Sequence, residues 1–190
     1  MRTDPSPVEI CILAGGASSR MGKDKARVRV WKQRTMLSII REQAEGVSGA
    51  TVRVIRRDLV PKCGPLGGVY TALKTTKASS VLFLACDMPL ITTGLLQKLL
   101  ARISDETEAL FMLSESAGFP FVLRTTALSM VEEQIARKEF SLHRLCQRMK
   151  GKVIEPSEAE ARQLANINTV EELDQLRIEW IQHANSPFRA

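Results

Sequence analysis

The sequence lacks an apolar run long enough to cross a membrane, and it has few aromatic residues. Aromatic residues occupy 5% of the 190 positions and are scattered rather than interleaved with basic residues, so a stacking surface for nucleic acid is not indicated. No internal repeat or low-complexity segment divides the chain. Charged residues make up 25% and hydrophobic residues 44%, a composition that can bury a core without disulfide or metal cross-links. We therefore exclude a membrane-spanning or fibrous protein.

Cysteine is scarce as well. Cys11, Cys63, Cys86 and Cys146 are far apart and form no C-x-x-C pair, which favours reduced, buried thiols over disulfides. Residues 1–7 lack the long apolar region of a signal peptide. Both features lead us to expect a cytoplasmic protein.

The excess of positive charge is confined to one segment. The chain has 27 Lys and Arg against 21 Asp and Glu, a net charge of +6. Residues 20–34 contain seven basic residues and one acidic residue, so the whole excess lies there, directly after a glycine-containing loop. This location favours a small polyanionic ligand over a long polymer.

Short apolar runs alternate with segments of helical periodicity, which predicts one α/β domain with a mostly parallel sheet. The predicted strands are residues 8–13, 51–55, 81–85, 109–113 and 119–123, and the predicted helices lie at residues 35–45, around 69–73, and at 92–103, 126–137, 141–150 and 170–183. Thr35 and either Thr92 or Thr93 are predicted helix caps, and Thr169 with Glu172 forms a predicted capping box. We expect the domain to span residues 1–190, with loose ends at 1–7 and 185–190.

Ligands of open α/β sheets bind beyond the carboxyl ends of the strands, and the loop over residues 13–25 is the first candidate there. Its glycines allow backbone N–H groups to approach phosphate, while Arg20, Lys23 and Lys25 supply positive charge. The glycine spacing matches neither G-x-x-x-x-G-K-[ST] nor G-x-G-x-x-G. An ordinary glycine turn beside a solvated basic surface is the alternative.

Asp87 is the second candidate, because it follows a fully apolar run and precedes Pro89. One carboxylate together with substrate phosphates suffices to hold Mg²⁺, although Asp is also a common turn residue. Asn166 and Asn168 form the third candidate. Their amides would face one side of an extended segment and could bind a metal or a substrate hydroxyl, or serve as turn residues.

Two further features are weaker. The Gly-Pro-Leu-Gly-Gly segment at residues 64–68 either allows a close approach of a ligand or leads into a helix. His143 lies among apolar residues of a predicted helix, and no Ser/His/Asp arrangement is discernible. We do not expect a catalytic histidine.

The glycine-containing loop strongly resembles the signature of the nucleotidyltransferases, and specifically of the molybdenum cofactor guanylyltransferase family. The matching residues are Leu13-Ala14-Gly15-Gly16-x-Ser18-x-Arg20-Met21-Gly22-x-Asp24-Lys25. Later segments follow in the family's order, namely Gly64-Pro65-Leu66-x-Gly68, Cys86-Asp87-Met88-Pro89, Gly118-Phe119-Pro120-Phe121 and Asn166-Ile167-Asn168-Thr169. The resemblance spans residues 10–176.

This resemblance implies a three-layer α/β/α Rossmann-like nucleotidyltransferase fold. It implies transfer of GMP from GTP to molybdopterin or its molybdenum-loaded form, with release of pyrophosphate, and transient contacts with cofactor-biosynthesis proteins or molybdoenzymes. The nucleotide-binding residues that we assign are Leu13, Ala14, Gly15, Gly16, Lys25, Asp58 and Asp87. The catalytic residues that we assign are Lys25, Asp87 and Arg20. We also expect Asp87 to bind Mg²⁺ or Mn²⁺, and Asn166 and Asn168 to bind the acceptor substrate.

The assignment of Asp58 rests on the family, in which an aspartate before Gly-Pro-Leu contacts the nucleotide. Asp58 is the one acid available in that stretch. Only 17 residues separate Gly46 from Gly64, room for one strand and a loop, whereas the family usually has two strand-like segments there. Trp31 to Arg34 also departs from the family's Gly-Lys-Pro-like turn, which we expect to alter a surface hairpin rather than the chemistry.

Three other functions remain open at this point. The first is a relative that uses CTP or a sugar-phosphate acceptor, although Gly15-Gly16 favours the guanylyl branch over the Ala-Gly of cytidylyl relatives. The second is a nucleotide-binding domain without turnover, conceivable because residues 47–63 are short. The third, a nucleic-acid-binding module, draws only on the basic segment.

Overall fold

A computed structural model of the chain describes residues 8–15, 25–104, 106–113 and 117–184. At Lys25, Ala117, His183 and Ala184 the backbone alone is described. Gly16 and Arg20 lie outside the described residues, as do the expected loose ends at 1–7 and 185–190.

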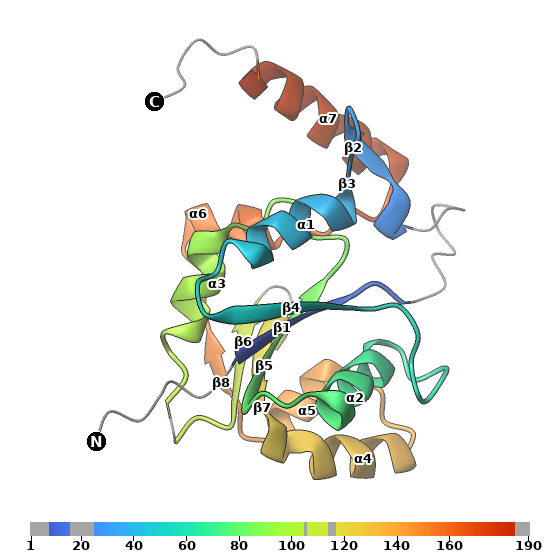
Figure 1. Cartoon of the computed structure of the whole chain (residues 1–190), viewed down its shortest axis with the longest axis vertical. Coiled ribbons are helices and arrows are strands. Elements are labelled where there is room, and N and C mark those ends of the chain that lie inside the picture. Colours follow the sequence, from blue (N-terminus) through green and yellow to red (C-terminus); the bar gives the residue numbers. More distant parts are fainter. Residues whose placement is uncertain (1–7, 16–24, 105, 114–116, 185–190) are drawn as a thin grey trace.

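A six-stranded sheet with the order β4-β1-β5-β7-β6-β8 forms the centre of the molecule (Figure 1). The strands are β1 (Val8–Leu13), β4 (Ala50–Ile55), β5 (Ser80–Ala85), β6 (Ala109–Leu113), β7 (Ala117–Arg124) and β8 (Lys152–Ile154). Strands β4, β1 and β5 pair in parallel, and β6 pairs in parallel with β8. Strand β7 is antiparallel to both of its neighbours, β5 and β6. The prediction of a mostly parallel sheet is therefore confirmed.

Helices cover both faces of the sheet, and this explains why its central strands are continuous apolar runs. Helices α1 (Met36–Glu45) and α3 (Thr93–Leu100) pack on one face, where Ile10 and Leu82 belong to the core. Helices α2 (Pro65–Thr75), α4 (Leu128–Ala136) and α5 (Leu142–Arg148) pack on the other, around Phe83 and Phe121. The layers can be followed in Figure 1, and they confirm the three-layer α/β/α prediction.

The predicted helix caps are present. The Thr35 hydroxyl accepts a hydrogen bond from the Ser38 N–H at 3.1 Å, and the Thr92 hydroxyl accepts one from Leu95 at 3.3 Å. Each bond satisfies an N–H that the first helical turn leaves without a partner. Of the two candidates, Thr92 is thus the cap of α3.

Two elements differ from the sequence-based expectation. Helix α2 begins at Pro65 rather than beyond Gly68, because a proline at the first helical position has no N–H to leave unpaired. Strand β8 was not predicted, because its three residues are too few to display a period and two of them are exposed. The remaining short elements are the 3₁₀ turns Lys25–Arg27, Thr125–Ala127 and Arg162–Leu164, and helix α6 (Glu158–Ala161).

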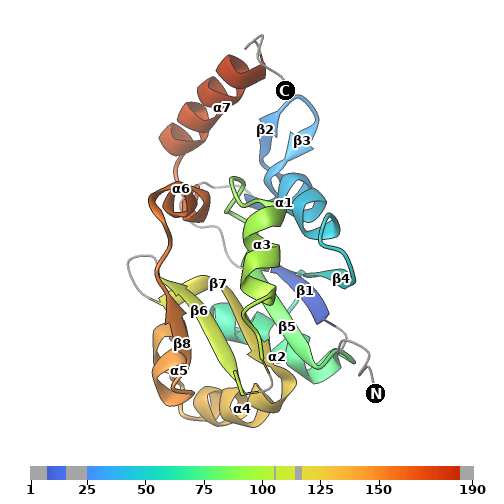
Figure 2. The same ribbon diagram turned by 90° about the vertical axis from the view of Figure 1, so that its left-hand side faces the viewer.

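A smaller cluster lies at one end of the molecule, where hairpin β2–β3 (Arg29–Trp31 and Arg34–Thr35) meets α7 (Val170–Ala184) (Figure 2). Val30, Leu173 and Leu176 are buried together in this cluster. The Arg34 guanidinium lies over the Trp180 ring, 5.4 Å from its centroid. The expected surface hairpin is present and holds α7 by apolar and cation–π contacts.

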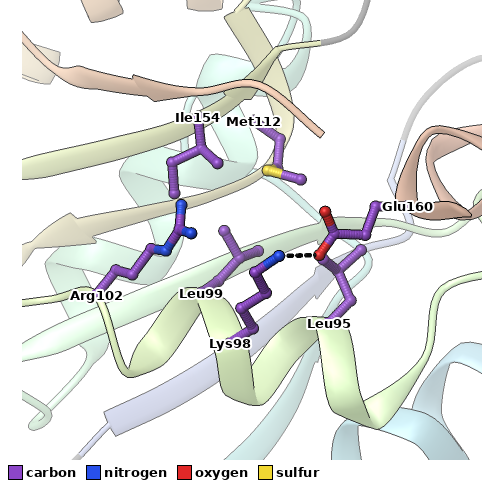
Figure 3. Close-up of a pocket in the computed structure, with 7 residues that line it drawn as sticks. All are labelled: Leu95, Lys98, Leu99, Arg102, Met112, Ile154 and Glu160. Carbon is purple, nitrogen blue, oxygen red and sulfur yellow. Dashed lines mark hydrogen bonds and ion pairs between the residues drawn. The ribbon is translucent and has the colours of Figure 1, made fainter. Parts of the chain in front are cut away.

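A shallow depression lies between α3, α6 and the β6–β8 edge (Figure 3). Its lining residues are Leu95, Lys98, Leu99, Arg102, Met112, Ile154 and Glu160. None of these is a site residue assigned from the sequence. An ion pair between Lys98 and Glu160 crosses the depression and ties α6 to α3.

Through the described ranges, no helix combines the length and apolarity that a membrane span requires. The described cysteines are free, and burial raises the pKa of the Cys11 thiol to about 12. A thiol with so high a pKa stays protonated at neutral pH and is therefore a poor nucleophile.

Stacked aromatic rings between β5, β7 and β6 predict a large stability effect. The Phe121 ring is fully buried, with its centroid 4.9 Å from that of Phe83 and 5.0 Å from that of Phe111. Phe121→Ala leaves a cavity at the centre of the sheet and should lower the free energy of unfolding by about 3–5 kcal/mol, measured by urea denaturation. Val153→Ala, at a side chain that is 46% exposed, should change it by about 0.5 kcal/mol at most. Equal losses in both variants would contradict this core.

The Lys98–Glu160 pair predicts that the Glu160 carboxyl group titrates at a lower pH than an ordinary glutamate. Hydrogen bonds from Lys98 and then from Ser157 lower the pKa of Glu160 from 4.5 to about 2. The carboxylate therefore favours the folded state above pH 4.5, and this contribution is lost as the pH falls through about 2. Lys98→Met should move the midpoint back toward 4.5, followed by carboxyl ¹³C NMR. Lys77→Met, at another exposed lysine, should leave it in place; an unmoved midpoint in Lys98→Met would disprove the assignment.

Candidate active site

The carboxyl ends of three neighbouring strands bring the predicted site segments together. Leu13, the last residue of β1, is in register with Ile55 of β4 and Ala85 of β5. The pairing continues one residue further, because the Ala14 N–H donates to the Ile55 carbonyl at 2.8 Å and the Cys86 N–H donates to the Leu13 carbonyl at 3.2 Å. The segments that follow these strands therefore leave the sheet side by side.

Leu13, Ala14 and Gly15 have different surroundings. The Leu13 side chain is buried against α2, and Ala14 packs against the core on the opposite face of the sheet. Gly15 is exposed. At the carboxyl end of β1 the backbone of Gly15 is therefore accessible to a ligand, while the Leu13 side chain anchors the strand in the core.

Gly15 is a glycine because another segment lies against it. A Cβ placed there would lie 3.1 Å from the Arg56 carbonyl oxygen and 3.7 Å from Oδ1 of Asp58. The chain after β4 therefore crosses close to the end of β1. Sequence reasoning placed Asp58 at the nucleotide only through the family, and the structure brings Asp58 next to Gly15.

Asp58 lies in a cradle of glycines. Oδ2 of Asp58 would be 2.8 Å from a Cβ on Gly67, and Oδ1 would be 3.5 Å from one on Gly68. Within the ranges that the structure describes, no residue forms a hydrogen bond or ion pair with this half-buried carboxylate. Burial raises the pKa of Asp58. The described residues therefore leave both oxygens of the Asp58 carboxylate able to accept hydrogen bonds from a ligand.

Thr71 fixes the Asp58 segment onto α2. Its hydroxyl accepts a hydrogen bond from the Leu59 N–H at 2.9 Å and donates to the Gly67 carbonyl at 2.8 Å. Sequence analysis did not identify Thr71. The available signal was a row of small residues on one helix face, at positions 67, 68, 71 and 72, which permits a chain segment to pack close to the helix.

Asp87 follows β5 and is joined to the third predicted segment. The Ile167 N–H donates to the Asp87 carbonyl at 2.8 Å, and Ile167 itself is buried. The structure therefore brings Asn166 and Asn168 to the turn that carries Asp87, although Ile167 lies 80 positions after Asp87 in the sequence (167 − 87). Asn166 is exposed and Asn168 is half-buried.

The chain next to Asn168 also caps α7. The Glu172 carboxylate accepts hydrogen bonds from the N–H groups of Asn168 at 2.6 Å and Thr169 at 3.0 Å, while the Thr169 hydroxyl accepts one from the Glu172 N–H at 3.1 Å. This is the capping box expected from the sequence. It holds the backbone of Asn168 in place beside the Asp87 turn.

The basic loop is described only at its end. The backbone of Lys25 begins the turn Lys25–Arg27, in which Ala26 is buried in the same core as Ile40. Gly16 and Arg20 lie outside the described residues, so their roles stay predictions. His143 is exposed and hydrogen-bonds Gln147 at 2.9 Å.

The Asp58 cradle predicts that Gly67 cannot be enlarged. A Cβ at Gly67 would lie 2.8 Å from the Val60 carbonyl oxygen as well as 2.8 Å from Asp58. Gly67→Ala should therefore lower the free energy of unfolding by about 1–3 kcal/mol, measured by urea denaturation.

Gly94 provides a matched control, because it also lies in the first turn of a helix and its nearest neighbour would be 3.9 Å away. Gly94→Ala should raise stability by up to about 1 kcal/mol. If Gly67→Ala is as stable as Gly94→Ala, the close packing of the Asp58 segment is incorrect.

Comparisons with known proteins agree with this geometry. The model of the family described as "MobA-like NTP transferase domain" matches residues 10–153. A protein of Flavobacterium johnsoniae named "Probable molybdenum cofactor guanylyltransferase" is 32% identical over 180 residues, which cover 88% of this chain and 95% of that protein. The "Molybdenum cofactor guanylyltransferase" of Pseudomonas putida is 29% identical, over 88% of this chain and 96% of that protein.

Among solved structures, the chain resembles "Molybdopterin-guanine dinucleotide biosynthesis protein A" from Archaeoglobus fulgidus. The TM-score is 0.75 at 18% identity, and the match covers 92% of this chain and 99% of that chain. At this identity the likeness shows the fold alone. The family match and the 32% identical relative show the family. The chain belongs to the molybdenum cofactor guanylyltransferases, a family of nucleotidyltransferase enzymes with a MobA-like NTP transferase domain.

Proposed function

We propose that the chain transfers the GMP part of GTP to the terminal phosphate of molybdopterin, with or without bound molybdenum, and releases pyrophosphate. The observation that carries this proposal is that Gly15, Asp58 and Asp87 follow the carboxyl ends of three paired strands, with Asp58 next to Gly15. Gly15 and Asp87 come from segments through which the chain resembles its family, and Asp58 lies in the connection that leads to Gly64. The product would be the guanine dinucleotide form of the cofactor.

In the proposed reaction the acceptor phosphate attacks the α-phosphorus of GTP in line with the departing pyrophosphate. No protein nucleophile is required, so positioning and charge neutralisation supply most of the acceleration. The backbone N–H groups of Gly15 and Gly16, together with Lys25 and Arg20, would hold the negative charge of the phosphates. Leu13 and Ala14 would hold this backbone in place, because they pack against the cores on opposite faces of the sheet.

Asp87 would hold Mg²⁺ or Mn²⁺ together with phosphate oxygens of GTP. In the described part of the chain, no three His, Cys, Asp or Glu side chains gather into a site that could hold a metal. One carboxylate plus phosphate oxygens is a donor set that Mg²⁺ accepts, so the residues present fit this ion. When bound, it would neutralise charge on the phosphates.

Asn166 and Asn168 would contact the acceptor, because their segment is hydrogen-bonded to the Asp87 turn. We propose a cytoplasmic location, in keeping with reduced thiols, and transient contacts with proteins that deliver or receive the cofactor. We expect neither nucleic acid nor a membrane as a partner.

CTP use is the nearest alternative, followed by nucleotide binding without turnover. Pyrophosphate release should be measured with GTP, CTP and ATP, each with and without molybdopterin and with Mg²⁺ present. Release from GTP that requires molybdopterin is the expected result. Release from CTP in preference to GTP, or GTP binding without any release, would overturn the proposal.

Asp87→Asn removes the proposed metal ligand without changing side-chain size. Pyrophosphate release from GTP should fall by roughly a hundredfold to a thousandfold, the usual effect of removing one charge-stabilising group. Thermal unfolding should stay close to that of the unmodified chain, because Asp87 is only half-buried.

Asp174→Asn, on α7 and paired with Arg177, is the control and should retain turnover. Unreduced Mg²⁺-dependent turnover in Asp87→Asn would rule out Asp87 as the metal ligand.

A further inference from the structure

The segment Arg56 to Asp58 borders the proposed nucleotide site, next to Gly15. Strand β4 is the outermost strand of the described sheet, and Arg56 follows its last residue. The carbonyl carbon and oxygen of Arg56 would lie 3.3 and 3.1 Å from a Cβ on Gly15. The segment is thus in direct contact with the backbone at the end of β1.

The charges of this segment are not used elsewhere in the described structure. Arg56 and Arg57 are exposed, and neither side chain forms a hydrogen bond or ion pair with a residue in the described ranges. The same holds for the carboxylate of Asp58 in those ranges. Most other arginines in the described part of the chain contact a carboxylate, as Arg41 and Arg162 do. Two cations and one anion therefore stand at successive positions with free binding capacity.

The position of the segment places it on the nucleoside side of the site, if the proposed function holds. The phosphates would lie between Gly15 after β1 and Asp87 after β5. The acceptor would enter beside Asp87, where Ile167 hydrogen-bonds the Asp87 carbonyl. The nucleoside would then extend in the opposite direction, past Gly15 toward the end of β4 and the segment that contains Arg56, Arg57 and Asp58.

Guanine is the base whose edges match this combination of charges. Its O6 and N7 accept two hydrogen bonds from one guanidinium, while its N1–H and N2–H groups donate to a carboxylate. Adenine presents a donor in place of O6, and cytosine has no N7 acceptor. A carboxylate and guanidinium groups at adjacent positions therefore distinguish guanine from both.

We propose that the Arg56–Arg57 pair determines the preference for guanine by donating hydrogen bonds to O6 and N7 of the base. The backbone of the segment is held on two sides, because the Leu59 N–H donates to the Thr71 hydroxyl of α2 at 2.9 Å and Arg56 packs against Gly15. This inference rests on the proposed function. It assigns recognition of the base to the short connection after β4, in the region where the family usually has a second strand-like segment.

The test compares equilibrium affinities for GTP, 7-deaza-GTP, ATP and CTP in the unmodified chain and in Arg56→Ala, Arg57→Ala and the double alanine variant. 7-Deaza-GTP has the same charge and the same N1 and N2 donors as GTP but lacks the N7 acceptor. The double variant should lose roughly 5- to 150-fold in its preference for GTP over CTP. It should also bind GTP and 7-deaza-GTP equally, whereas the unmodified chain should favour GTP.

Double lysine substitution at Arg56 and Arg57 separates charge from geometry. Lysine keeps the positive charge but cannot form the two parallel hydrogen bonds of a guanidinium, so the preference for GTP should stay reduced. Arg102→Ala, at an exposed arginine of the depression in Figure 3, is the control and should keep it. Thermal unfolding checks that each variant is folded.

Two results would overturn the inference. An equal loss of affinity for all four nucleotides, restored by lysine, would make the pair a phosphate-binding group. An unchanged ratio of GTP to CTP affinity in the double alanine variant would give the pair no role in base selection. Failure of the unmodified chain to release pyrophosphate from GTP with molybdopterin would instead count against the proposed function, so the two failures can be told apart.

Discussion

The parallel pairing of β1 with β4 on one side and β5 on the other is the constraint on which the site depends. In a parallel sheet the carboxyl ends of neighbouring strands lie at the same edge. The register aligns Leu13 with Ile55 and with Ala85, so the chain leaves all three strands at the same level. The segments that carry Gly15, Asp58 and Asp87 begin at that edge because the hydrogen bonds of the sheet bring together strands that are distant in the sequence.

The two apolar layers stabilise this register. A slip by one residue in β1 would exchange the side chains facing the two cores, and would move Leu13 away from Gly68 and α2. Because both faces of β1 are buried, no such slip is tolerated. Packing in the core therefore fixes the position of the strand ends at the site. Phe121 contributes to this packing although it is not one of the assigned site residues.

The regular elements were predictable because their periods are unambiguous. Val81–Leu84 is too apolar for anything but a buried strand, and Thr35 precedes a run whose buried positions recur at helical spacing. The beginning of α2 was not predictable from its glycines, since two consecutive glycines usually end a helix rather than lie in its first turn. Gly67 and Gly68 are tolerated because Asp58 and Leu13 occupy the space that side chains would need. Strand β8 is formed by pairing with β6, a long-range interaction with no local signal.

The sequence indicated the segments that the structure brings to one edge of the sheet. Asp87 was chosen from chemistry, because it follows a buried apolar run, although the same position also suits a turn residue. Asp58 could be chosen only through the family, and its contact with Gly15 could not be read from spacing. Thr71 was missed because hydroxyl groups on helices are common and carry no distinct pattern. Its contribution depends on the Leu59 N–H and Gly67 carbonyl that it contacts.

The outer position of β4 has a consequence for the behaviour of the protein at high concentration. No described strand covers its outer edge, and an uncovered strand edge can pair with the same edge of another molecule and begin an aggregate. Two copies that paired in parallel along β4 would place their arginine pairs close to each other, and the repulsion between like charges would oppose that contact. The residues proposed to read the base would thus also disfavour parallel pairing between neighbouring molecules. Neutral replacements at these positions would be expected to reduce colloidal stability as well as selectivity, a trade-off relevant to engineering this enzyme for another nucleotide.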